Sequence, residues 1–233
     1  MIEAEWWEHE DAAAFAEAVA GDLGFIVESA LDARGAAFLA LSGGKTPFPA
    51  YELLAKQKFD WKKVVIVPVD DRLVKVDDPL SNVGQLARIF MPKGARVIPL
   101  GADNKDVAQA GNAADARLQD LPWPPDVVLL GVGGDGHTAS IFPGPNYQAA
   151  LDAPKTRRAI GVTPDPMPAD APVPRVTLTR AAILQARALM LALTGADKRR
   201  VVEQAIKDGA SSDKPIGRVL AEAEQAIDIH WAP

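Results

Sequence analysis

The residues of this chain that are best suited to chemistry lie in a glycine-rich stretch, GVGGDGHTASIFPG at residues 131–144. It contains His137, one of three histidines in the chain, and Asp135 lies two positions before it. A histidine exchanges a proton near neutral pH, and a neighbouring carboxylate can orient its ring and stabilise its charged form. His137 is therefore a candidate general base with Asp135 as its partner, and a purely structural histidine is the competing interpretation.

Two cations are placed where they can hold an anion. Arg72 follows two carboxylates in VDDRLVKVDDPLSN at residues 69–82, and Lys198 falls in the first turn of an expected helix. A guanidinium can meet a phosphate with two parallel hydrogen bonds, and a helix start favours negative charge. The alternatives, an ion pair of Arg72 with Asp70 and Asp71 and a solvated Lys198, stay open on these residues alone.

A third candidate is the loop Ser42-Gly43-Gly44, which follows an apolar run. The order Gly44-Lys45-Thr46 resembles the end of a nucleotide-binding P-loop, but that motif needs a glycine five positions before Gly44, where this chain has Leu39. Glycines let the backbone approach a ligand, so the loop is a candidate for binding some other anion. A tight strand-to-helix turn with a solvated Lys45 is the alternative.

The run GVGGDG at residues 131–136 also satisfies the dinucleotide-binding pattern G-x-G-x-x-G. That motif requires a helix directly afterwards, whereas the residues that follow are HTASIFPGP, broken by two prolines and a glycine. NAD or FAD binding is therefore not expected. The G-x-S-x-G elbow of serine hydrolases does not occur either.

These loops must be positioned by strands and helices that alternate along the chain. Apolar runs of strand length occur at residues 36–41, 64–69, 96–100, 126–132, 158–163, 175–179, 188–194 and 226–231. Helical patterns occur at residues 11–34, 51–57, 82–90, 106–118, 196–207 and 216–224. We predict a single α/β domain over residues 1–233, with an open, mostly parallel sheet covered by helices on both faces. In such sheets ligands bind beyond the carboxyl ends of the strands, where the three candidate loops lie.

Composition narrows the function further. The 233 residues are 48% apolar and 24% charged, and the formal net charge is −6, which argues against binding to nucleic acid or to an anionic membrane surface. The absence of cysteine excludes disulfides, thiolate zinc sites and cysteine nucleophiles. The N-terminal stretch lacks the pattern of a secretory signal and no apolar run approaches the ~20 residues of a membrane span, so we expect a cytoplasmic protein.

Taken together and in order, the segments SGGKTP, DDR…SN, GVGGDGHTASIFPG, TGADK and PIGRVL resemble the 6-phosphogluconolactonase family, which belongs to a larger group with glucosamine-6-phosphate deaminase and isomerase. The resemblance covers residues 42–220. It implies the modified Rossmann-like sheet also found in ribose-5-phosphate isomerase and CoA-transferase. The implied activity is hydrolysis of 6-phospho-D-glucono-1,5-lactone to 6-phosphogluconate in the oxidative pentose phosphate pathway, with neither cofactor nor metal.

The resemblance also implies roles for particular residues. His137 would activate water and Asp135 would help to hold the geometry. The only expected partner is a small phosphorylated sugar lactone, without nucleic acid or membrane, and the chain would be a monomer or a weak homo-oligomer. The residues expected to bind the substrate are Ser42, Gly43, Gly44, Arg72, Asn82 and Lys198.

Particular sequence positions distinguish the lactonase from two alternative functions, a deaminase and a non-catalytic binder. The deaminase branch is expected to carry a glutamate five residues after the histidine, where this chain has Phe142, and a DEY-like element where it has Asp71-Arg72. A non-catalytic sugar-phosphate-binding regulator should lack the base. The chain departs from the usual lactonase pattern at Asp71, where glutamate is common, and at Lys75, where proline is common, which weakens any role for Asp71.

Overall fold

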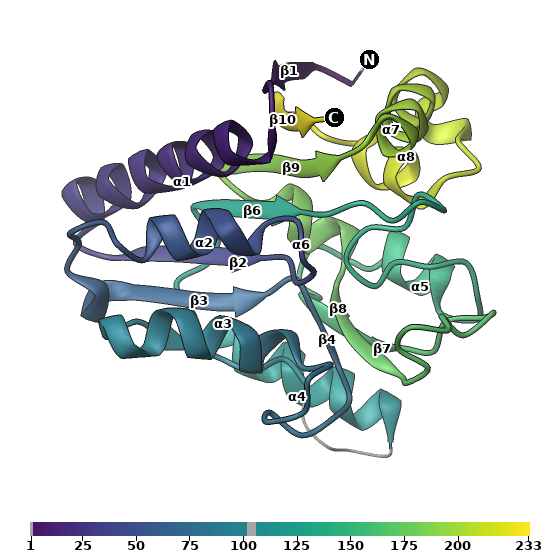
Figure 1. Cartoon of the computed structure of the whole chain (residues 1–233). Coiled ribbons are helices and arrows are strands. Elements are labelled where there is room, and N and C mark those ends of the chain that lie inside the picture. Colours follow the sequence, from purple (N-terminus) through teal and green to yellow (C-terminus); the bar gives the residue numbers. More distant parts are fainter. Residues whose placement is uncertain (1, 102–105) are drawn as a thin grey trace.

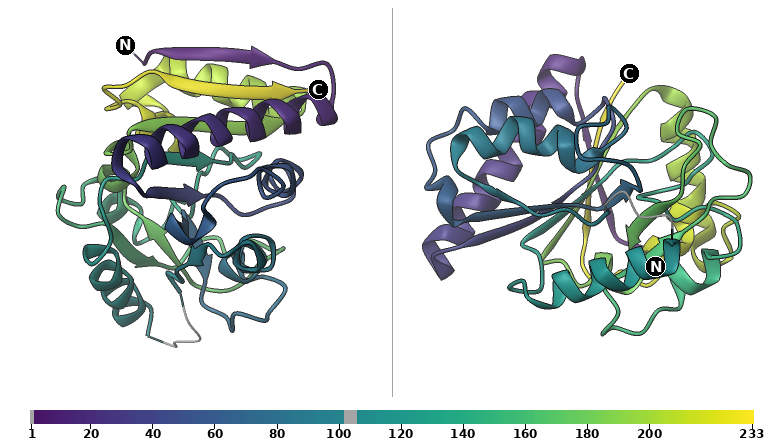
Figure 2. Two further views of the ribbon diagram at one scale, coloured as in Figure 1. Left: turned by 90° about the vertical axis from the view of Figure 1, so that its left-hand side faces the viewer. Right: turned by 90° about the horizontal axis from the view of Figure 1, so that it is seen from below.

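Seven strands in parallel form the main sheet of the computed structural model, which describes residues 2–101 and 106–233 (Figure 1). The strand order is β1-β10-β9-β6-β2-β3-β5, which confirms the expected α/β class. The first and last strands of the chain lie side by side at one edge (Figure 2). The strands are β1 (Ala4–Glu8), β2 (Ala37–Leu41), β3 (Val64–Pro68), β5 (Arg96–Val97), β6 (Val127–Leu130), β9 (Ala188–Thr194) and β10 (Ile227–Ala232).

A second, antiparallel sheet was not foreseen. It consists of β4 (Asp70–Arg72), β8 (Arg175–Leu178) and β7 (Ala159–Val162), in the order β4-β8-β7. The apolar runs at 158–163 and 175–179 are strands as predicted, but they pair with each other instead of joining the main sheet. Residues 70–82 were expected to be a loop, because a strand of two aspartates and an arginine carries no apolar periodicity.

The helices follow the predicted order. The last helix ends at Leu220 instead of residue 224. Asp11 caps the start of the longest helix, because its carboxylate accepts hydrogen bonds from the N–H groups of Ala13 and Ala14. No helix in the described part of the chain is both long and apolar enough to cross a bilayer. The helices are α1 (Ala12–Arg34), α2 (Phe48–Leu54), α3 (Asn82–Phe90), α4 (Val107–Gln119), α5 (Tyr147–Leu151), α6 (Arg180–Leu184), α7 (Ala196–Asp208) and α8 (Pro215–Leu220).

Both faces of the main sheet are buried. Successive side chains of a strand point to opposite faces, so Phe38 and Ala40 of β2 join one core while Leu39 and Leu41 join the other. The first core is closed by α4, α6, α7, α8 and the small sheet, and the second by α1, α2 and α3. This double coverage explains the near-continuous apolar strands seen in the sequence.

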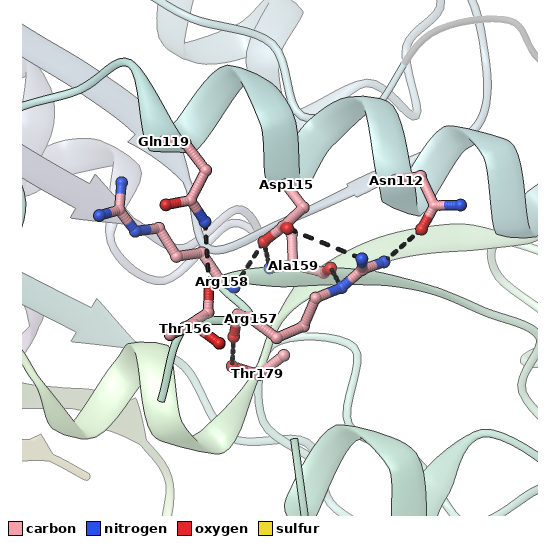
Figure 3. Close-up of polar contacts among 8 residues, drawn as sticks. All are labelled: Asn112, Asp115, Gln119, Thr156, Arg157, Arg158, Ala159 and Thr179. Carbon is pink, nitrogen blue, oxygen red and sulfur yellow. Dashed lines mark hydrogen bonds and ion pairs between the residues drawn. The ribbon is translucent and has the colours of Figure 1, made fainter. Parts of the chain in front are cut away.

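Helix α4 is fastened to β7 by a set of polar contacts (Figure 3). The Asp115 carboxylate accepts the N–H groups of Arg158 and Ala159 at 2.6 and 3.2 Å, and the Arg157 guanidinium donates to the Asn112 side chain at 2.7 Å. The backbones can approach this closely because Gly111 faces the strand without a side chain. The small sheet, and with it β8, is thereby held in place against the rest of the fold.

A buried carboxylate shapes the connection from β4 to α3. One oxygen of Asp71 accepts the N–H of Asn82 at 2.8 Å and that of Arg72 at 3.0 Å, and burial raises the pKa of this carboxyl to about 7. Ser81 caps α3, since its hydroxyl accepts the N–H of Gly84 at 3.0 Å. The buried Asp71 carboxylate thus fixes the backbones of Arg72 and Asn82.

Two glycines in helix interiors should respond oppositely to the same substitution. A Cβ at Gly111 would lie 2.1 Å from the backbone nitrogen of Gly161, whereas a Cβ at Gly21 in α1 would meet nothing within 4 Å. We expect Gly111→Ala to lower the free energy of unfolding by about 2 kcal/mol or more, because backbone must move. Gly21→Ala should raise it by roughly 0.5–1 kcal/mol, the ordinary gain in helix propensity.

Urea unfolding of the two variants and the wild type measures both effects. A Gly111→Ala protein as stable as the wild type would contradict the close approach of α4 and β7.

Candidate active site

A cavity of about 260 Å³ lies beyond the carboxyl ends of the central strands. The loops after β2, β6 and β9 reach it, as do β4 and β8, and Figure 1 shows the arrowheads of β9, β6 and β3 pointing to the same side of the molecule. Such a crevice at the strand ends is where open α/β sheets bind ligands. Seven of the eight residues predicted for the site line it, namely Ser42, Gly43, Gly44, Arg72, Asn82, His137 and Lys198.

The eighth, Asp135, contacts His137. One carboxylate oxygen lies 2.5 Å from the imidazole Nδ1 and also accepts the backbone N–H of His137 at 3.1 Å. The hydrogen bond with His137 lowers the pKa of Asp135 to about 2, so this carboxyl is charged at neutral pH. A charged acceptor at Nδ1 holds the proton on that nitrogen and leaves Nε2 with a lone pair. The pair therefore has the arrangement that a general base requires.

Gly133 makes room for this pair. A Cβ there would lie 2.2 Å from two atoms of the His137 ring and 2.6 Å from the Asp135 carboxylate. Its N–H donates to the His137 carbonyl at 2.9 Å, and the N–H of Gly136 donates to the Gly133 carbonyl at 3.0 Å. The glycines of GVGGDG thus build the turn that carries the histidine. The next helix after them is α5, which begins at Tyr147, whereas a dinucleotide fingerprint leads directly into a helix.

Arg175 is a cavity residue that the sequence reasoning missed. It lies on β8 directly opposite Arg72 of β4, and both side chains line the cavity. Like charges opposite each other on paired strands destabilise a sheet, and burial lowers the pKa of the Arg175 guanidinium. A bound anion would relieve both costs. The available signal was an arginine at the start of the strand-like run 175–179, but its partner Arg72 was assigned to a loop.

Arg72 is held by a network that also uses Asn82. The Arg72 guanidinium donates to the Asn82 side-chain oxygen at 2.9 Å and to the Leu80 carbonyl at 3.0 Å. The Asn82 amide nitrogen donates to the carbonyl and carboxylate oxygens of Asp70 at 2.8 and 3.2 Å. The Asn82 side chain also packs so tightly against Gly43 that a Cβ there would lie 2.0 Å from its oxygen. Asn82 lines the cavity, but its amide is occupied in orienting Arg72.

Several buried polar atoms around the cavity have no partner. Within the described residues, five buried side-chain nitrogen or oxygen atoms lack a hydrogen bond, and three of them belong to the cavity residues Ser42, Arg72 and Arg175. Leaving such a group unpaired typically costs about 1–3 kcal/mol. The N–H of Ser42 donates to the Leu129 carbonyl at 3.0 Å, so this residue offers its hydroxyl to the cavity instead of its amide. Their gathering around one cavity indicates a polar ligand.

The charges around the cavity favour an anion. Lys45, Arg72, Arg175 and Lys198 line it, against the carboxylates of Asp70 and Asp170, in a chain whose net charge is −6. Asp70 is engaged by the Ser140 hydroxyl at 2.5 Å. Among the described residues, no group of three His, Cys, Asp or Glu side chains is arranged to hold a metal ion. A cationic cavity can bind a small anion, and a base beside that cavity can activate water to add to the bound molecule.

Comparison with known proteins agrees with this chemistry. Residues 10–231 match the family described as "Glucosamine-6-phosphate isomerases/6-phosphogluconolactonase". A 6-phosphogluconolactonase of Mesorhizobium japonicum is 38% identical over 98% of this chain and 95% of its own length. The crystal structure of a 6-phosphogluconolactonase from Shewanella baltica has a TM-score of 0.90 at 32% identity and covers 100% of both chains.

A monomeric glucosamine-6-phosphate deaminase has a TM-score of 0.80 at 18% identity, covering 98% of this chain and 97% of its own, which shows the common fold alone. The relation to the lactonases is closer, since it extends over nearly the whole sequence at more than 30% identity. This chain belongs to the glucosamine-6-phosphate isomerase and 6-phosphogluconolactonase family.

Proposed function

We propose that this chain hydrolyses 6-phospho-D-glucono-1,5-lactone to 6-phosphogluconate, with His137 as the general base. The lactonases that it resembles over nearly full length make it a lactone hydrolase, an enzyme of the oxidative pentose phosphate pathway. The observation that carries the proposed mechanism is the His137–Asp135 pair, which opens into a cavity where Arg72 and Arg175 lie opposite each other. Water, a base and an anchor for the phosphate are the parts that this hydrolysis needs.

The first step is attack by water on the lactone carbonyl. His137 Nε2 takes a proton from the water as its oxygen bonds to the carbonyl carbon, and a tetrahedral intermediate with a negative oxygen forms. The charged Asp135 carboxylate stabilises the imidazolium that results. A positioned base of this kind gives typically about 10²–10⁴-fold acceleration, and the lactone is already an activated ester.

The second step opens the ring. The bond between the carbonyl carbon and the ring oxygen breaks, and the imidazolium returns its proton to that oxygen, which becomes a hydroxyl of the open-chain product. His137 is then neutral again and ready for the next water. The backbone amides of Gly133 and Gly136 are engaged within their own loop, so they are poor candidates for stabilising the negative oxygen.

The phosphate binds at the cationic side of the cavity. We assign it to the guanidinium groups of Arg72 and Arg175 together with Lys198, because the two arginines lie directly opposite each other on β4 and β8 and all three side chains line the cavity. Charge-assisted hydrogen bonds to phosphate fix its position. Holding the substrate at its remote end places the lactone carbonyl in reach of the water. Among the described residues, no hydrogen bond is found from the N–H of Gly43 or Gly44, so these amides can add to the phosphate site.

Other activities fit less well. In a deaminase-like reaction the position five residues after the histidine would supply a carboxylate, whereas here Phe142 places an aromatic ring against His137. A non-catalytic sugar-phosphate binder would have no use for an oriented histidine and its carboxylate. We therefore retain the lactonase as the function of this site.

The setting of the enzyme is proposed from its composition. We propose that residues 1–233 act as one domain, as a monomer or a weak homo-oligomer, in the cytoplasm. The absence of cysteine suits a reducing compartment. The proposed reaction consumes water and the phosphorylated lactone, with no nucleic acid or membrane as partner.

Removal of the base should abolish most of the catalysis. We expect His137→Ala to lower kcat by about 10²-fold or more, because water then lacks its proton acceptor. The measurement is the rate of hydrolysis of fresh phosphorylated lactone, corrected for the spontaneous reaction. His9→Gln, a histidine outside the cavity, is the matched control and should keep the wild-type rate. A folded His137→Ala protein that retained a third of the wild-type kcat would rule out His137 as the base.

Comparing lactones with and without a phosphate tests whether Arg175 binds the phosphate. We expect Arg175→Met to raise KM for the phosphorylated lactone by about 10-fold or more, the effect of losing roughly 1.5–3 kcal/mol from a charged hydrogen bond. For D-glucono-1,5-lactone, which has no phosphate, kcat/KM should stay near the wild-type value. Arg200→Met, at an exposed arginine outside the cavity, controls for loss of charge. An equal loss with both lactones would contradict this assignment of Arg175.

A further inference from the structure

One aromatic ring contacts both halves of the proposed site. The imidazole of His137 stacks on Phe142, with ring centroids 4.0 Å apart and an angle of 24° between the planes. The guanidinium carbon of Arg175 lies 4.8 Å from the centroid of the same ring. Phe142 is 9% exposed and is therefore fixed within the protein. The base and a phosphate-binding arginine thus share a single support.

Each of these two side chains has few polar contacts of its own. His137 has its hydrogen bond to Asp135, but its side chain is 31% exposed and that of Asp135 is 59% exposed. The hydrogen bond at Nδ1 fixes one end of the imidazole but does not by itself fix the plane of the ring. Arg175 donates to the Ala171 carbonyl at 3.0 Å, while its Nε has no partner within the described residues. A planar stacking partner supplies the missing constraint to both.

The turn that leads from His137 to Phe142 is itself anchored. Ile141 is fully buried and donates its N–H to the Thr138 carbonyl at 2.9 Å. The Ser140 hydroxyl lies 2.5 Å from the Asp70 carboxylate, and the Ser140 N–H donates to the Thr177 hydroxyl at 3.1 Å. These contacts tie the turn to the small sheet on which both arginines lie. The ring of Phe142 is therefore a rigid support that moves with the phosphate site.

We propose that Phe142 is a positioning residue for the hydrolysis, which sets the plane of the His137 imidazole and the direction of the Arg175 guanidinium together. The inference rests on the proposed function. The aromatic face also attracts a cation, so the stack becomes more favourable when His137 takes up the proton from water. Ordinary core packing would need only an apolar side chain of similar size at this position, and this difference makes the two roles separable.

Kinetics of three variants test the proposal. Phe142→Leu keeps the apolar bulk and loses the ring, and we expect it to lower kcat by about tenfold or more and to raise KM for the phosphorylated lactone severalfold. Phe142→Tyr keeps the ring and should restore both constants to near the wild-type values. Phe59→Leu removes a partly buried aromatic ring outside the cavity and should change neither constant. Equal kinetics for a folded Phe142→Leu and the wild type would overturn the proposal.

Proton NMR of the histidine rings gives a readout independent of activity. The chain has three histidines, and His137→Gln identifies the Cε1–H resonance of His137. In the wild type the ring current of a stacked Phe142 should shift this resonance upfield of its position in free histidine. Phe142→Leu should return it downfield, whereas Phe142→Tyr should leave it in place. A wild-type resonance at the free-histidine position would overturn the stack even if Phe142→Leu does not fold.

The two measurements keep the inference and the proposed function distinguishable. If the wild type hydrolyses the lactone and Phe142→Leu does so equally well, the positioning role fails and the lactonase stands. If the folded wild type shows no turnover above the spontaneous rate, the lactonase fails, and the catalytic role of Phe142 fails with it whatever the NMR shift shows.

Discussion

Two arginines that face each other across paired strands impose the constraint on which the rest of the site depends. Arg72 and Arg175 are in register on β4 and β8, and both line the cavity. Two contacts offset part of their repulsion. The Asn82 side-chain oxygen accepts a hydrogen bond from Arg72, and the Arg175 guanidinium lies over the Phe142 ring. In the proposed site an anion that binds between them removes the remaining cost, which would reserve binding energy for a phosphorylated substrate.

His137 is far from Arg72 and Arg175 in the sequence, but the fold brings these residues to the same cavity. His137 lies on a loop of the main sheet, and the turn that follows it is bonded to the small sheet through Ser140 and Asp70. Short polar contacts therefore set the position of the proposed base relative to the proposed phosphate site. This arrangement suits an activated ester, for which correct placement of water supplies most of what catalysis requires.

Where the signal is local, the sequence predicts which residues lie around the cavity. Apolar runs precede His137, Asp135 and the Ser42-Gly43-Gly44 loop, and the types of these residues indicate what chemistry they can do. The structure places them at or beside the cavity, where the alternating pattern indicated. Most of the main sheet follows for the same reason, but its edge strand β1 (Ala4–Glu8) was not among the expected strands. Arg175 was missed because its significance lies in pairing with Arg72, and β4 has no apolar pattern from which pairing can be predicted. The role of Phe142 is equally a matter of tertiary contact.

A crystal structure with 6-phosphogluconate bound would test the central claim most directly, because it locates both ends of the product at once. We expect phosphate oxygens at about 2.7–3 Å from guanidinium nitrogens of both Arg72 and Arg175. We also expect the new carboxylate next to His137, with an oxygen within about 3.5 Å of Nε2. A phosphate bound away from the two arginines, or a carboxylate turned away from His137, would contradict it.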